Sequence, residues 1–175
     1  MAVIEAITTT YLQADTGYIQ WLSIPQTYEH LQIRASFQDG NATNNATNFA
    51  LAVYVNNDNN TSSYTKNYLR GSNTTSLGAA NAASSEMGFF GADPDIPNYG
   101  TFVIDILDYT NPNKLTTITA LNGYNGTVPM VTFGGSVFHN GADTDAVDQI
   151  LLVSYATSNF LAGGSATLYG MKAAN

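Results

Sequence analysis

The stretch FALAVYV, residues 49–55, decides the fold of this 175-residue chain. In an extended chain, alternate side chains point to opposite faces, so the phenylalanine, the leucine and the valines share one face while the alanines and the tyrosine share the other. Apolar side chains on both faces are typical of a strand that is covered on both sides. The stretch therefore predicts a buried β-strand in a layered protein.

The same alternation recurs along the chain. In FVIDIL, residues 102–107, Phe102, Ile104 and Ile106 share one face of an extended chain. Segments of this kind, separated by clusters of Asn, Gly, Asp and Pro, predict strands at residues 2–10, 17–24, 28–37, 48–56, 64–70, 100–109, 115–122, 129–138, 148–156 and 165–172. We therefore expect an all-β protein, an antiparallel β-sandwich of the jelly-roll type with about eight to ten strands in a single domain.

The chain divides into an N-terminal arm or strand, residues 1–11, and a sandwich domain, residues 12–175. Within that domain, residues 71–98 are rich in Ala, Ser and Gly and show no clear alternation. This segment predicts a long loop, and loops of that length in compact domains are usually functional or packed against a neighbour.

Composition and charge exclude several classes of function. The formal net charge is −8 and the pI is about 4.2, which repels phosphate backbones and anionic lipids, so we expect neither nucleic acid nor membrane as a partner. Cysteine is absent, which excludes disulfides, thiolate nucleophiles and cysteine-ligated metals. The N-terminal residues lack the basic start and apolar stretch of a signal peptide, so we expect no secretory signal.

Candidates for catalysis are few. Of the two histidines, His30 lies on the polar face of a predicted strand and His139 at a predicted strand end, and no G-x-S-x-G motif is present. Asp93 and Asp95 are a possible carboxylate pair for glycoside hydrolysis, but they flank a proline in the predicted loop, where Asp is an ordinary turn residue. We therefore predict no enzymatic activity and no cofactor, and a glycosidase is the least favoured class.

A cation site is the other alternative. Carboxylates of Asp143, Asp145 and Asp148, with backbone carbonyls, offer the oxygen ligands that a hard cation prefers. The EF-hand spacing is absent, because the glycine precedes the acids and no glutamate closes the loop. A solvated acidic loop is the favoured interpretation, and we predict no metal.

Three phrases of the sequence resemble those of tailed-phage virion structural proteins. They are LSIPQTYEHLQIR at residues 22–34, YLRG at 68–71 and GSATLYGMK at 164–172, and their order and spacing match. With the stretch at residues 99–119, the resemblance spans most of the chain, although the phrase at residues 54–58 is only loosely similar. It implies a structural role in the virion, in the head or associated with the tail, and no catalytic residue.

We therefore expect a virion protein that decorates or cements the phage head, bound to the major capsid protein or another virion protein and to sibling copies, as a homotrimer. A low charge and an apolar N-terminal segment suit burial against such neighbours. The alternative is a tail-fibre or spike domain that binds host-surface glycans. The candidate interface residues are Val3, Ile4, Ile7, Tyr11, Met87, Phe89, Phe90 and Ile96.

Overall fold

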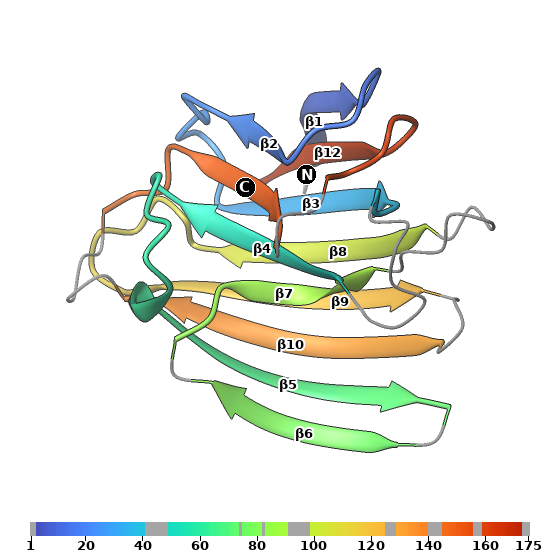
Figure 1. Cartoon of the computed structure of the whole chain (residues 1–175). Helices are drawn as coiled ribbons and strands as arrows, with labels where there is room; N and C mark the ends of the chain where they lie inside the picture. Colours follow the sequence, from blue (N-terminus) through green and yellow to red (C-terminus); the bar gives the residue numbers. More distant parts are fainter. Residues whose placement is uncertain are drawn as a thin grey trace.

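The structure, a computed structural model, describes residues 3–40, 49–73, 75–81, 83–90, 99–124, 129–139, 145–155 and 159–172. These residues form two antiparallel sheets of 8 and 4 strands (Figure 1). In spatial order, the larger sheet contains β1 (Val3–Tyr11), β12 (Ser165–Lys172), β3 (His30–Phe37), β8 (Gly100–Leu107), β9 (Thr116–Tyr124), β10 (Met130–Phe138), β5 (Tyr64–Ser72) and β6 (Ser76–Asn81). The smaller sheet contains β2 (Tyr18–Trp21), β11 (Ile150–Ser154), β4 (Phe49–Val55) and β7 (Glu86–Phe90). One 3-10 helix, Thr61–Ser63, precedes β5.

The strand order confirms the jelly roll. Eight strands, β1, β2, β3, β4, β7, β8, β11 and β12, build its two halves. If these strands are numbered one to eight in chain order, their spatial order is 1-8-3-6 in the larger sheet and 2-7-4-5 in the smaller sheet. This alternation of consecutive strands between two sheets is the double Greek key of the jelly roll.

Two hairpins are added to this framework. The pair β5–β6 follows β4 and the pair β9–β10 follows β8, and all four strands join the larger sheet beyond β8. Strand β7 packs against β8, β9 and β10, whereas β5 and β6 extend below the smaller sheet in Figure 1. We call β9, β10, β5 and β6 the sheet extension.

The core lies between the two sheets. In β4, every residue from Ala50 to Val55 is buried, which confirms that this strand is covered on both faces. In β8, Phe102, Ile104 and Ile106 are buried while the residues between them are partly or fully exposed, as the alternation predicts. One end of the core is closed by Phe37, whose ring stacks on Phe160 with the ring centroids 4.3 Å apart.

The expected loop over residues 71–98 is wrong in part, because this segment contains β6 and β7. Strand β6, SLGAAN, consists mostly of glycine, alanine and asparagine, which have a low β propensity, and β7 has only 5 residues, so local sequence does not reveal these strands. Strand β6 forms because it continues a tight turn from β5, in which the Ser72 N–H donates to the Thr75 carbonyl at 2.9 Å. Strand β7 forms by pairing with β4. Residues 91–98 lie outside the described residues.

The N-terminal segment forms strand β1, at one edge of the larger sheet, and pairs with β12. The pairing register shifts between Ala6 and Thr8, so that Ile7 forms a bulge in β1. The N-terminal segment is thus an edge strand of the domain.

An ion pair joins the sheet extension to the smaller sheet. The Lys66 ammonium on β5 donates a hydrogen bond to the Glu86 carboxylate on β7 at 2.6 Å. The Lys66 side chain is 5% exposed, so this charge is almost fully removed from water and depends on Glu86.

Candidate functional site

An exposed apolar row crosses the outer face of the larger sheet. Phe133 on β10 lies opposite Leu69 on β5 and opposite Leu121 on β9, and Val131 precedes it by two positions on the same face. The exposed fractions are 66% for Leu69, 57% for Phe133, 51% for Leu121 and 58% for Val131. We call these four residues the outer apolar patch.

The strand alternation places the patch outside. On β10, Met130, Thr132 and Phe138 point inward and are buried, so Val131 and Phe133 must point to the other face. No third layer covers that face in the part of the chain that the structure describes, and the patch therefore meets solvent. Contiguous apolar surface of this kind marks sites of interaction with other molecules.

The surroundings of the patch are neutral. The described outward positions of the sheet extension carry only threonine, asparagine, serine, glycine, alanine and the apolar residues, and no charged side chain. Charged residues are depleted at the centres of protein–protein interfaces, because a charge buried without a partner is costly. The composition of this face therefore fits a protein partner.

Two open grooves flank the row of exposed side chains. One has a volume of about 550 Å³ and runs over β6, β5 and β10, where Gly78 and Gly135 leave room above the backbone. The other has a volume of about 260 Å³ and lies over β8 and β9, between Val103, Leu121 and Val131. Alternating ridges and grooves of this size can receive side chains of a partner.

The candidate interface residues from the sequence lie elsewhere. Ile4 and Tyr11 on β1 are 57% and 70% exposed, Val3 is partly buried, and Ile7 packs against the core. The prediction for Met87 is wrong, because its side chain is 4% exposed and belongs to the core between the sheets. Ile96 and the side chains of Phe89 and Phe90 lie outside what the structure describes.

Of the three aspartates considered as cation ligands, the structure describes Asp145 and Asp148. Both are exposed. The Ile24 N–H donates to the Asp148 carbonyl at 2.9 Å, and the Asp148 N–H donates to Asn56 Oδ1 at 3.0 Å. Asp143 lies outside the described residues, as do Asp93 and Asp95. His139 is partly buried, and its backbone N–H donates to the Ser63 carbonyl at 2.8 Å.

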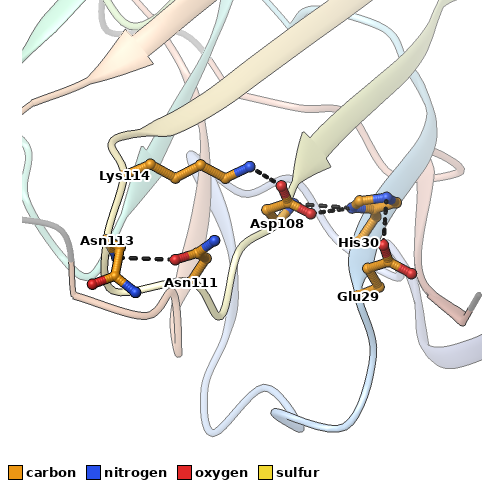
Figure 2. Close-up of polar contacts among 6 residues, drawn as sticks. All are labelled: Glu29, His30, Asp108, Asn111, Asn113 and Lys114. Atoms are coloured by element: carbon orange, nitrogen blue, oxygen red, sulfur yellow. Dashed lines mark hydrogen bonds and ion pairs between the residues drawn. The ribbon is translucent and has the colours of Figure 1, made fainter.

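A different cluster, which sequence reasoning missed, brings His30 together with Asp108 (Figure 2). His30 begins β3, and Asp108 follows β8 in a left-handed conformation with φ of 49°. The Asp108 backbone N–H donates to His30 Nδ1 at 2.9 Å, and Asp108 Oδ1 lies 3.3 Å from the same nitrogen. His30 Nε2 faces Glu29 Oε1 at 3.7 Å, while the Lys114 ammonium contacts Asp108 Oδ2.

This geometry favours a structural role for the cluster over a metal site. His30 Nδ1 already accepts a hydrogen bond, so the lone pair that a metal needs at this nitrogen is occupied. The Lys114 ammonium neutralises the carboxylate that would have to bind a cation. The contacts instead tie the start of β3 to the turn between β8 and β9.

We expect added metal to have little effect on the stability of the protein through the His30–Asp108 cluster. Addition of about 1 mM Zn²⁺ or Ca²⁺ should shift the melting temperature by less than about 1 °C, because His30 Nδ1 and the Asp108 carboxylate are already engaged by groups of the protein. Differential scanning fluorimetry with and without EDTA measures this. A saturable rise that disappears in His30→Ala would contradict the interpretation.

Arg34 on β3 is linked to an acid through a neighbouring side chain. Arg34 Nε donates to Gln32 Oε1 at 2.9 Å, and Gln32 Nε2 donates to Asp105 Oδ1 at 2.8 Å. The arginine thus reaches Asp105 through Gln32, on the outer face between β3 and β8, beside the outer apolar patch.

No protein-family model, curated protein or solved structure matches this chain. Among the described residues, no helix is long and apolar enough to span a bilayer.

Proposed function

We propose that this protein is a non-enzymatic structural protein of a tailed-phage particle and that its outer apolar patch binds another protein of that particle. The observation that carries the proposal is the patch: four large apolar side chains, each more than half exposed, on the outer face of the sheet extension, whose described outward positions carry no charged side chain. Such a face is costly to leave in water and gains free energy when a partner covers it.

The resemblance of three sequence phrases to tailed-phage virion structural proteins supports the particle as the setting. Within the particle, a head decoration or cement role fits best, because an open sheet face suits a broad contact with the capsid lattice. A capsid surface also offers many equivalent positions to a protein of this size.

The exposed tyrosines support the alternative of a fibre or spike domain. Tyr18 on β2 and Tyr155 after β11 are 57% and 41% exposed, and exposed aromatic rings are suited to stacking on flat ligand faces. In this alternative the partner is a glycan of the host surface.

The number of copies per particle separates these roles. A cement protein should occur in numbers comparable to the major capsid protein, and particles without it should burst at a lower temperature. A fibre domain should occur in few copies, and its loss should abolish adsorption. Absence of the protein from purified particles would refute a virion role.

The double variant Leu69→Ser/Phe133→Ser tests the patch itself. Truncation of one apolar hot-spot residue typically weakens binding by about 2 kcal/mol, or roughly 30-fold, so the double variant should be nearly absent from particles. Quantitative mass spectrometry of purified particles measures its occupancy. Both side chains are exposed, so folding should be retained.

Two further variants keep this test specific. Leu22→Ser removes an equally exposed side chain, at 58%, outside the larger sheet and should leave occupancy unchanged. Ile4→Ser/Tyr11→Ser tests the N-terminal edge strand. If that variant is lost from particles while the patch variant is retained, the contact lies on β1 and the assignment to the patch is wrong.

A further inference from the structure

Strand β6 forms an open edge of the larger sheet. It pairs with β5 from Lys66 to Gly71, and its other side meets no strand in the part of the chain that the structure describes. Figure 1 shows β6 as the outermost strand, at the end of the sheet opposite β1. An open edge offers unpaired backbone N–H and C=O groups to another strand.

The turn before β6 identifies those groups. Ser72 and Thr75 form a hydrogen-bonded pair at the turn, and hydrogen-bonded and non-hydrogen-bonded pairs alternate along an antiparallel ladder. The pairs of Ser76 with Gly71, Gly78 with Leu69 and Ala80 with Asn67 are therefore non-hydrogen-bonded. Ser76, Gly78 and Ala80 direct their N–H and C=O groups away from β5.

The other edges carry features that discourage pairing. Strand β1 is bulged at Ile7 and carries Glu5, and β7 is bulged and carries Glu86. Strand β2 has only 4 residues. Strand β6, with the sequence SLGAAN, has no charge, no proline and no break in its register with β5. Charges, prolines, bulges and short length are the usual devices that protect edges, and β6 has none of the first three.

Charge favours a meeting of two copies at this edge. The chain carries a net charge of −8, so two copies repel each other unless they meet where charge is sparse. Strand β6 is uncharged, and so are the outward positions of β5 and β10 beside it. The edge is also self-complementary, because an antiparallel pair of identical strands satisfies the same groups in both copies.

We propose that a second copy of this chain pairs with β6 through its own β6, antiparallel and across a two-fold axis, which gives a dimer in place of the homotrimer expected from the sequence. With the axis at Gly78, Ser76 of one copy lies opposite Ala80 of the other, and about six backbone hydrogen bonds form. The two larger sheets then become one continuous sheet. Both outer apolar patches lie on the same side of it, which doubles the surface available to the partner in the proposed function.

Dimerisation through β6 is a property of the isolated protein, so it can be absent while the virion role holds, and it can be present while the virion role fails. Light scattering coupled to size-exclusion chromatography should give a mass of twice 18.6 kDa. Ala80→Pro removes an outward N–H without removing a bond to β5, and prolines are tolerated at such edge positions. This variant should raise the dimer dissociation constant at least about tenfold, because one peptide hydrogen-bonding group is lost in each copy.

Two single lysine variants provide a matched comparison. Ala80→Lys places an ammonium at the β6 edge and should dissociate the dimer. Thr117→Lys places the same charge on the same sheet face, on β9 and away from the edge, and should leave the dimer intact. Circular dichroism confirms that each variant is folded.

Amide hydrogen exchange identifies the paired groups. In the dimer, the N–H groups of Ser76, Gly78 and Ala80 should exchange at least about tenfold more slowly than in the diluted monomer. A wild-type protein that is a monomer or a trimer overturns the proposal. So does a dimer whose dissociation constant is unchanged in Ala80→Pro, or one in which these three amides remain unprotected.

Discussion

Replacing Glu86 with leucine should lower the free energy of unfolding by about 3–5 kcal/mol, the typical cost of leaving one member of a buried ion pair without its partner. The Lys66 ammonium is held at 2.6 Å from the Glu86 carboxylate in a position where its side chain is 5% exposed. A nearby tyrosine ring, Tyr68, lies 5.0 Å from the ammonium and cannot replace a full negative charge. Urea denaturation of both proteins measures the difference.

The reverse variant and the double variant complete a thermodynamic cycle. Lys66→Met should cost less than Glu86→Leu, because the Glu86 side chain is 24% exposed and can be hydrated when its partner is removed. The double variant Lys66→Met/Glu86→Leu should recover most of the loss, since apolar pairs often replace buried ion pairs at little cost. Additive losses would show that the two side chains do not interact in solution.

Replacing Phe37 with alanine should destabilise the protein by about 3–5 kcal/mol, the range for a buried aromatic side chain removed from a packed core. Phe37 is fully buried at the end of β3 and contacts two other rings, with centroid distances of 4.3 Å to Phe160 and 6.2 Å to Phe102. Phe160 lies outside the strands, so Phe37 also anchors the segment that precedes β12. Thermal and urea denaturation report the change.

Phe133→Ala is the matched control for this prediction. The same side chain is removed from the same sheet, but from the outer face, where Phe133 is 57% exposed. Its loss should cost less than about 1 kcal/mol. Equal losses for the two variants would mean that the outer face is covered in the isolated protein, and the assignment of faces would then be wrong.

Local alternation predicts much of the fold. All ten predicted strands occur, because side chains such as Phe102, Ile104 and Ile106 repeat every second residue and thereby mark both the strand and its buried face. Of the two missed strands, β6 lacks this pattern, and in β7 the alternation is limited to Met87 and Phe89. Strand β6 depends on pairing with β5 across a turn, and β7 depends on pairing with β4, which is distant in the sequence. The β propensity of single residues does not report such pairing.

The candidate surfaces were harder to predict than the strands. On β10, Val131 and Phe133 alternate with Met130 and Thr132, and either face could have been the core. The pairing of His30 with Asp108 joins residues that are 78 positions apart. No spacing rule connects them, because they meet only where β3 and β8 lie side by side.

By itself, the sequence determined the class of structure, since alternation and turn residues act within a few positions of one another. It also determined the low charge and the absence of thiol chemistry, which are properties of composition. Only the tertiary structure decided which apolar side chains remain in water, because burial depends on which face of the larger sheet the smaller sheet covers. The sheet extension turns its outer face away from the smaller sheet, and that face and the β6 edge are left for other molecules to bind.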